Sequence, residues 1–370
     1  MSTKLREKLT GAVPFFENSS TEHDYPSQTV YQTVPHDGDV KGVYHAHSRH
    51  SDGLDDFDRM LKGAARLRLD YYGFMDHLDL TGISNQVHQG PWMGYFSENM
   101  EYRKTGIEDY IEDTSADIAE DEGVSLEVGR GAEIDWDPRN IDKLVDASSS
   151  LDMDYRGVSV HYFGDGKSVK DPSVIQDSTI EERVGEYLNE TVSAIEAAPD
   201  ALFDVICHPG RPEEGVLEPG FAAEDYYPIL DAAKEEGVVY EINPKVHLRY
   251  LLDKDVIPPQ LETSEDYLAQ LPSEFEALAT YPDELPEVSI GTDTHRVGHS
   301  KTHRNHYIAM RDLEFSGFDN SHLTETQMRL KFAEDILNQL SQIRGQPVQP
   351  TSILENKDTS TLTFRNEDLN

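Results

Sequence analysis

Residues 40–53 read VKGVYHAHSRHSDG, and the pattern in this stretch returns along the rest of the chain. The short apolar and β-branched run Val40–Tyr44 predicts a strand that ends directly before two histidines. Apolar residues then recur at spacings of three and four from Leu54 to Leu67, which predicts an amphipathic helix. The stretch therefore predicts a βα unit with metal-ligand side chains at the carboxyl end of its strand.

Further βα units are expected downstream. The sequence predicts strands at 71–75, 125–128, 158–160, 202–206, 238–242 and 288–290, and helices around 107–120, 178–197, 222–236, 264–281 and 325–343. Alternating strands and helices are typical of a parallel α/β architecture, in which functional side chains gather at the carboxyl ends of the strands.

Three segments are expected along the chain. A polar lead-in covers 1–38, a barrel domain covers 39–344, and a polar tail that we expect to be frayed covers 345–370. Within the barrel domain, two irregular stretches at about 78–106 and 251–286 indicate insertions. Both flank the expected mouth of the barrel, so we expect them to shape specificity.

The composition is strongly acidic: 71 Asp and Glu against 32 Lys and Arg give a net charge of −39, spread along the chain. At molar salt the Debye length falls to about 3 Å, so this charge favours adaptation to a high-salt cytoplasm. It argues against binding of long nucleic acids, which needs basic surfaces. The sequence contains neither a membrane-spanning apolar run nor a secretory apolar segment, so we expect a cytoplasmic protein.

The single cysteine, Cys207, excludes an internal disulfide and a zinc site built from several cysteines. It lies within the apolar run 201–207, so we expect a small core residue.

Ligand-type side chains follow six of the expected strands. Residues i and i+2 of an extended segment share a face, so His45 and His47 can hold one ion, and Asp293 and His295 form a similar pair. Each of these residues, taken singly, is more commonly a surface or satisfied core side chain, but ligand-type residues at six strand ends are hard to obtain by chance. Nitrogen and carboxylate ligands without sulfur favour zinc, manganese or iron over magnesium or calcium. The complete set is His45, His47, Asp52, His77, Glu133, His161, His208, Asp293 and His295.

The order of these motifs resembles the PHP family of metal-dependent phosphoesterases. The series consists of HxHxxxxDG at 45–53, DH at 76–77, GxExD at 131–135, VH at 160–161, HP at 208–209 and DxH at 293–295. The residues around several motifs resemble those of the histidinol-phosphatase branch, namely GAEIDWD at 131–137, SVHYFGDG at 159–166, YEIN at 240–243 and GTDTH at 291–295. One position departs from that branch, because Gly53 stands where the branch has a histidine, which leaves the exact substrate open.

The resemblance implies a distorted (β/α)7 barrel that holds three divalent metal ions. In the implied assignment Glu133 bridges two of the ions. The first ion would be held by His45, His47, Glu133 and Asp293, the second by Glu133, His161 and His208, and the third by Asp52, His77 and His295.

The implied activity is hydrolysis of a small phosphate monoester, such as histidinol phosphate. Clustered ions lower the pKa of bound water from about 16 toward about 7, so a metal-activated hydroxide can attack phosphorus in line. Arg211, Lys245 and Arg296 follow motif strands and are candidates for anchoring the phosphate, and His299 is a candidate for protonating the leaving alcohol.

Three alternatives stay open at this point. One is a PHP-type nuclease or oligonucleotide phosphodiesterase, against which the acidic composition argues when the substrate is long. Another is a metal-dependent amide or carbamate hydrolase, because the same hydroxide can attack a carbonyl carbon. The third is a non-catalytic barrel that binds metal structurally, which would require broken motifs.

Overall fold

A computed structural model describes residues 40–48, 51, 53, 55, 57–78, 123–150, 153–201, 203–246, 272–295, 325–353 and 360–365. These residues belong to one compact unit, Thr33–Asn370. The expected lead-in (1–38), the helix at 107–120 and the first insertion beyond residue 78 lie outside the described residues, as does the part of the second insertion before residue 272.

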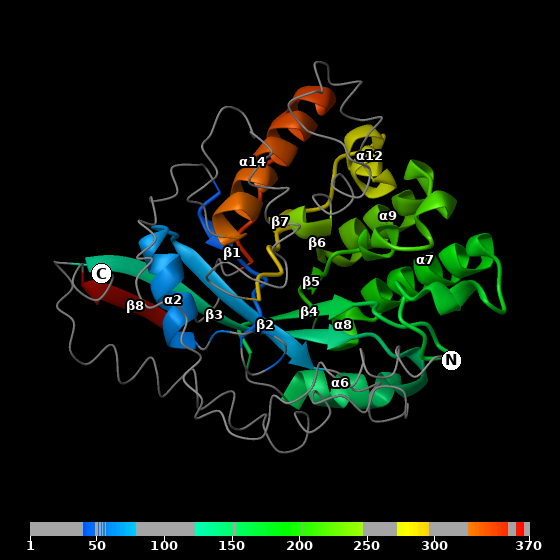
Figure 1. Cartoon of the computed structure of the whole chain (residues 1–370), viewed down its shortest axis with the longest axis horizontal. Helices are drawn as coiled ribbons and strands as arrows, with labels where there is room; N and C mark the ends of the chain where they lie inside the picture. Colours follow the sequence, from blue (N-terminus) through cyan, green and yellow to red (C-terminus); the bar gives the residue numbers. More distant parts are fainter. Residues whose placement is uncertain are drawn as a thin grey trace, which may run out of the picture. The chain divides into compact units, whose positions relative to one another are not determined.

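Seven parallel strands pair in sequence order around a barrel (Figure 1). They are β1 (Gly42–Val43), β2 (Tyr71–Leu78), β3 (Gly123–Asp135), β4 (Tyr155–Ser159), β5 (Val205–Ile206), β6 (Val239–Ile242) and β7 (Val288–Ile290). The circle closes at the carboxyl ends, where Ala46 pairs in parallel with Thr294 and the His47 N–H donates to the Thr294 carbonyl at 2.8 Å. The predicted (β/α)7 barrel class is therefore confirmed.

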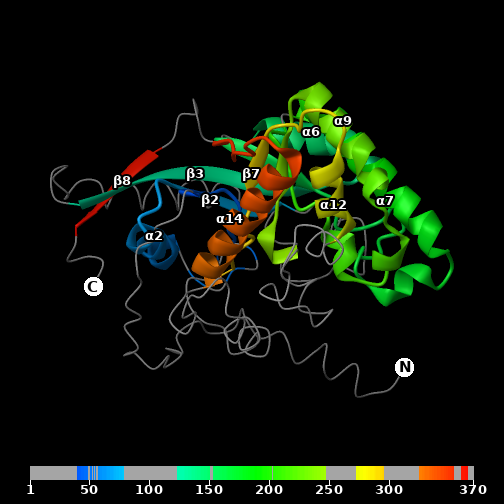
Figure 2. The same cartoon turned by 90° about the horizontal axis from the view of Figure 1, so that it is seen from above.

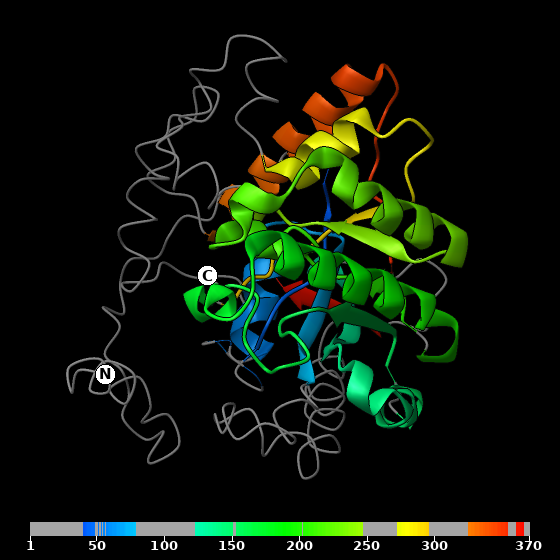
Figure 3. The same ribbon diagram turned by 90° about the vertical axis from the view of Figure 1, so that its right-hand side faces the viewer.

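Helices follow the strands and cover the outside of the barrel. They are α2 (Phe57–Arg66), α6 (Ile141–Ser150), α7 (Ile180–Glu196), the short α8 (Ala198–Ala201), α9 (Tyr227–Glu236), α12 (Ser273–Thr280) and α14 (Glu325–Arg344). Figure 3 shows α7 and α9 (green) side by side, beneath α12 (yellow) and α14 (orange). The connections that the structure describes contain five short 3-10 helices: η3 (Pro138–Asn140), η4 (Pro172–Ile175), η5 (Arg211–Glu214), η6 (Glu218–Gly220) and η7 (Ala223–Tyr226).

Local sequence explains where the helices begin and end. The Thr179 side chain accepts the Glu182 N–H, and the Glu182 carboxylate accepts the Thr179 N–H, so a capping box starts α7. Helix α9 ends at Gly237, whose φ of 69° is left-handed and suits a residue without a Cβ atom. Helix α6 was not predicted, although it follows β3 as the barrel pattern requires.

Apolar side chains fill the barrel beneath its carboxyl-terminal edge. Tyr44, Met75, Tyr155 and Cys207 form part of one buried cluster. Cys207 is 1% exposed and its sulfur lies 3.4 Å from that of Met75, which confirms the prediction of a core residue. The strands are close enough that a Cβ atom at Gly157 would lie 2.4 Å from the Cys207 sulfur. The interior is therefore packed, and the open edge above it is available for a site.

The prediction of a frayed tail is wrong for part of the segment after Gly345. Strand β8 (Ser360–Arg365) pairs antiparallel with the first half of β3, alongside which it lies in Figure 2. Strand β3 is correspondingly longer than the predicted 125–128, because its first half pairs with β8 while its second half pairs with β4. The polar composition of the tail gives no sign of a strand, because β8 forms through its pairing with β3.

Helix α12 lies within the range expected for the second insertion, but it packs as a barrel helix. Phe275, Ala277 and Leu278 are completely buried in the main core. Among the described residues, no helix combines the length and the apolar character needed to cross a membrane.

Candidate metal centre

Strand ends bring eight of the nine expected ligands to the carboxyl edge of the barrel. The ninth, Asp52, lies outside the described residues, as do Arg296 and His299. His45 and His47 follow β1, His77 lies on β2, Glu133 on β3, His161 follows β4, His208 follows β5, and Asp293 and His295 follow β7.

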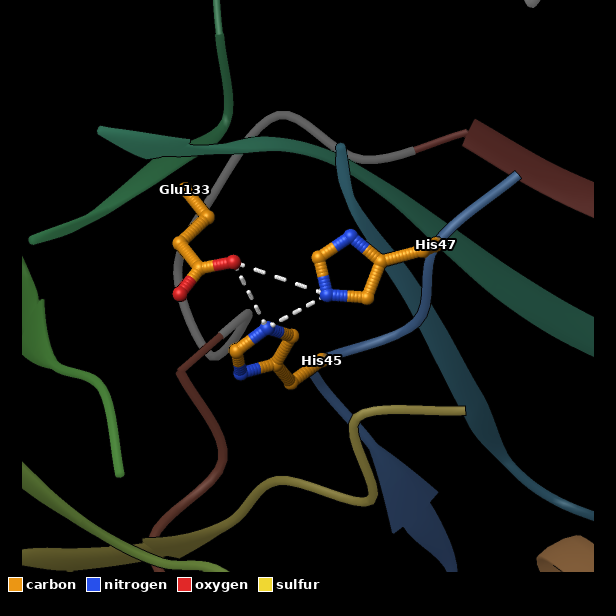
Figure 4. A group of neighbouring side chains, drawn as sticks. All are labelled: His45, His47 and Glu133. Carbon is orange, nitrogen blue, oxygen red and sulfur yellow. Dashed lines mark hydrogen bonds and ion pairs between the residues drawn. The ribbon is translucent and has the colours of Figure 1, made fainter. Parts of the chain in front are cut away.

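The Glu133 carboxylate lies at the centre of this group, and its side chain is fully buried. Oε2 lies 3.4 Å from His45 Nε2, 3.5 Å from His47 Nε2 and 3.0 Å from His77 Nδ1. Figure 4 shows His45 and His47 converging on this oxygen. Oε1 lies 2.7 Å from His208 Nε2 and 3.2 Å from His161 Nε2. Each oxygen therefore faces a separate set of histidines.

The spacing of the donor atoms fits bound cations. Two ligand atoms, each about 2.0–2.1 Å from a tetrahedral zinc ion, lie about 3.4 Å apart. His45 Nε2 lies 3.0 Å from His47 Nε2, and His161 Nε2 lies 3.4 Å from His208 Nε2. Glu133 Oε2 is buried and accepts no hydrogen bond from the described residues. Facing ring nitrogens and an unsatisfied carboxylate oxygen are the environment that a divalent ion would satisfy.

Asp293 and His295 complete the side of the site next to His47. Asp293 Oδ1 lies 3.3 Å from both His47 Nε2 and His295 Nδ1. The rings of His77 and His295 each lie 4.5 Å from the His47 ring, measured between centroids. His77 shares a potential ligand group with Glu133 and His161, whereas His295 shares one with His47 and Asp293.

Backbone strain occurs at two of these residues. His208 has a φ of 32° and Asp293 a φ of 47°, and only one other described non-glycine residue, Arg68, has a positive φ. Such a conformation costs on the order of 1–3 kcal/mol and persists where the surroundings enforce it. At Asp293 they do so through the buried Arg329 on α14, whose Nη1 donates to the carbonyls of Thr292 and Asp293 at 2.5 and 2.7 Å. Arg329 was not among the predicted site residues, because α14 is far from the motif in sequence.

The electrostatic environment keeps both carboxylates ionised. Burial alone would raise the pKa of Glu133, but the surrounding histidines hold it well below its usual value. Lys245 and His295 likewise outweigh burial at Asp293, whose pKa is well below normal. Burial lowers the pKa of His161 and His208, which favours neutral imidazoles. Ionised carboxylates and neutral imidazoles are the states that coordinate a metal ion.

At His45 the carboxylates determine the direction instead. Burial lowers its pKa, but Glu241 and Glu133 raise it by more, so that the pKa is well above its usual value.

Three basic side chains lie near the ligand-type group. Lys245 Nζ lies 2.5 Å from Asp293 Oδ2, and Arg211 Nη1 lies 3.3 Å from His208 Nε2. Lys170, which was not among the predicted site residues, pairs with Glu214. Burial and the nearby Arg211 lower the pKa of Lys170 to about 8. Lys170 follows the motif residue His161 by nine residues, so its sequence position did not mark it as a neighbour of the site.

Acidic side chains hold the loops that carry the histidines. Asp76 accepts the backbone N–H of Ser48 at 2.7 Å and the Ser51 hydroxyl at 2.5 Å. Asp135 accepts the backbone N–H of His161 at 3.1 Å. These bonds connect β2 and β3 to the loops that follow β1 and β4.

Comparison with protein-family models agrees with the resemblance of the motif series to the PHP family. A family model described as the PHP domain matches residues 44–245, more than half of the chain. The chain belongs to the PHP family. Asp293 and His295 lie beyond the residues that match the PHP domain, and they reach the same site because β7 closes the barrel beside β1.

No curated protein matches the chain. One similar solved structure is the histidinol phosphate phosphatase (HISK) from Lactococcus lactis subsp. lactis Il1403, complexed with zinc, L-histidinol and phosphate. It is 19% identical, and the alignment covers 73% of this chain and 92% of that chain with a TM-score of 0.49.

Proposed function

We propose that this PHP-family chain is a metal-dependent phosphoesterase that hydrolyses a small phosphate monoester. The observation that carries the proposal is the position of Glu133. Its two buried oxygens lie 2.7–3.5 Å from nitrogens of five histidines at the carboxyl edge of the barrel. A carboxylate whose two oxygens face separate sets of nitrogen ligands suits a multinuclear hydrolase better than a structural site, because a structural zinc is enclosed by four ligands of its own.

The proposed ligand sets are those that the motifs imply. When bound, divalent ions such as zinc, manganese or iron would activate water and neutralise charge on the phosphoryl oxygens. The first set is His45, His47, Glu133 and Asp293, the second is Glu133, His161 and His208, and the third is Asp52, His77 and His295.

Arg211 and Lys245 are proposed to bind the phosphoryl group. Both are partly exposed, 23% and 13% for their side chains, so they can reach a substrate from the edge of the ligand group. The planar Arg211 guanidinium can donate two parallel hydrogen bonds to a phosphate. On a chain with a net charge of −39, basic side chains beside the site favour an anionic substrate there.

Histidinol phosphate is the first substrate to test, because the residues around Glu133, His161 and Asp293 resemble that branch. Arg296 and His299 remain proposals, as a further phosphate contact and as the proton donor to the leaving alcohol.

The test is an assay of phosphate release by protein purified in high salt and loaded with Mn²⁺ or Zn²⁺. Histidinol phosphate is compared with other monoesters, a phosphodiester and short oligonucleotides. We expect turnover of a monoester that is lost in His45→Ala and kept in Arg139→Ala, which changes a side chain that bonds to Asp137 and Gly164 instead. Release only from oligonucleotides or the diester would favour a nuclease. Full metal occupancy without release from any phosphate ester would overturn the proposal.

A further inference from the structure

Strand β6 is the exception among the seven strands of the barrel, because it contributes no expected ligand to the site. Its carboxyl end instead carries Glu241, with Asn243 directly after the strand and Lys245 in the helical turn that begins at Pro244. Glu241 is 1% exposed and Asn243 is completely buried. A buried carboxylate in a barrel interior requires partners, and those of Glu241 point to its role.

Glu241 contacts the face of His45 that is turned away from the ligand group. Its Oε2 lies 2.8 Å from His45 Nδ1, while its Oε1 accepts a hydrogen bond from Asn243 Nδ2 at 2.7 Å. Asn243 is held in turn, because its Oδ1 accepts the Lys245 backbone N–H at 3.0 Å. Lys245 Nζ then reaches Asp293. Glu241 on β6 and the two residues after the strand therefore connect His45 with Asp293, which follow the two strands that close the barrel.

The contact with Glu241 determines which nitrogen of His45 is available to a metal. A carboxylate only accepts hydrogen bonds, so in the neutral imidazole that binds a metal ion the His45 proton lies on Nδ1 and the lone pair on Nε2. Nε2 is the atom directed at His47 and Glu133 in Figure 4. A carboxylate behind a metal-binding histidine fixes its tautomer and ring orientation, and increases its basicity.

The neighbouring strand leaves room for this carboxylate. A Cβ atom at Gly291, directly after β7, would lie 2.1 Å from both Cδ and Oε1 of Glu241. Any larger residue at this position would displace Glu241 from His45.

We propose that Glu241 is a positioning residue for His45, that Asn243 holds Glu241 in place, and that β6 thereby sets the metal affinity of a site to which it gives no ligand. The inference rests on the proposed metal site. It differs from a direct role for Glu241, which could share an ion with Cys207 and His45 in a separate buried group.

The test uses hydrogen-bond polarity. In Glu241→Gln the single amide oxygen cannot accept from both His45 Nδ1–H and Asn243 Nδ2, so one bond is lost. In Asn243→Asp two carboxylates face each other at hydrogen-bonding distance. The double variant restores the pattern, because the new amide N–H can donate to the new carboxylate while its oxygen accepts from His45. Zn²⁺ affinity is measured for all four proteins by competition with a chromophoric chelator.

We expect each single variant to bind Zn²⁺ about 10- to 100-fold more weakly, and the double variant to recover most of this loss. The control Asp154→Asn changes another buried carboxylate, which bonds to Arg130 before β4 at the opposite end of the barrel, and its affinity should match wild type. Wild-type affinity in the single variants would overturn the inference and leave the metal site standing. Loss in the double variant as large as the sum of the single losses would also overturn it.

Two further outcomes are distinguishable. A wild-type protein that binds no Zn²⁺, Mn²⁺ or Fe²⁺ would overturn the proposed function and this inference together. A thiolate charge-transfer band in the cobalt-loaded wild type would show Cys207 coordination, and would overturn the positioning role in favour of direct binding by Glu241.

Discussion

Glu133 shows, at the scale of one residue, how a site for cations is built into a protein interior. Its side chain has no exposure, so its charge is compensated by the histidines around it and not by water. His45, His47 and His77 face one oxygen, while His161 and His208 face the other. Removal of the Glu133 charge therefore affects both sets of histidines together.

Glu133→Gln should therefore reduce the amount of bound metal and lower phosphate release by more than 100-fold. Loss of a residue that hydrogen-bonds to a metal ligand reduces metal affinity by roughly 10- to 100-fold, and loss of the proposed bridging ligand itself should exceed this. Metal content after dialysis is measured by elemental mass spectrometry, in parallel with activity. The exposed Glu224→Gln serves as a matched control and should change neither quantity. Unchanged metal content in Glu133→Gln would contradict the bridging role.

At the scale of elements, the loop after His208 and helix α12 are joined by a buried carboxylate. Pro272 precedes α12 and offers no side-chain cap. Instead Glu213, on η5, accepts the backbone N–H groups of Ser273 at 2.7 Å and Glu274 at 2.8 Å. Burial raises the pKa of Glu213 to about 7 despite these bonds. The first turn of α12 is thus capped from the same segment that carries Arg211.

This raised pKa predicts a pH dependence of stability. In the unfolded chain a glutamate has a pKa of about 4.3, so between about pH 4.3 and pH 7 the folded chain holds a proton that the unfolded chain has released. The contribution of Glu213 to the free energy of unfolding therefore falls by about 3 kcal/mol as the pH rises through this window, and is constant above it. Urea titration from pH 5 to pH 8 measures the free energy of unfolding of wild type and of Glu213→Gln. The wild-type value minus the variant value should decrease as the pH rises. A difference that is constant with pH would contradict this assignment.

Packing between elements gives a second prediction. Gly157→Ala should destabilise the protein by about 1–3 kcal/mol, because the new Cβ atom would lie 2.4 Å from the Cys207 sulfur and 2.6 Å from the Met75 sulfur. Gly185→Ala is the matched control, since no atom lies within 4 Å of its new Cβ and Gly185 is inside α7. It should stabilise the protein by about 0.5–1 kcal/mol. Urea unfolding measures both, and equal effects would contradict the packed barrel interior.

The whole molecule carries a net charge of −39, and this charge opposes the compact state at low ionic strength. Many acidic side chains on helices are exposed, for example Glu181 and Glu182 at the start of α7. The interior, by contrast, compensates its charges locally, as at Glu133 and Asp293. Salt should therefore act mainly on the surface.

The midpoint of thermal unfolding should rise with KCl from 0.1 M to 2 M, because the Debye length decreases from about 10 Å toward about 3 Å. Circular dichroism during heating measures this midpoint. Sucrose at matched osmolarity is the control, since it is excluded from the surface without screening charge, and it should give the smaller rise. A midpoint that does not respond to KCl would contradict adaptation of this acidic surface to high salt.

The sequence by itself determined the barrel class and the residue types at the strand ends. Period-two alternation places His45 and His47 on one face, and strand polarity places each motif at the same edge; both are local properties that a single strand encodes. The bounds of the strands were predicted less accurately, because the length of β3 depends on the pairing of its first half with β8.

Only the tertiary structure decided which of these residues meet. Asp293 lies beside His47 because Thr294 pairs with Ala46 across the closure of the barrel. Glu241 faces His45, and Lys170 lies near Arg211, through contacts between segments remote in sequence. Periodicity records which face a side chain occupies, whereas the partner on that face is set by long-range packing, strand closure and the balance of buried charge, none of which any one segment contains.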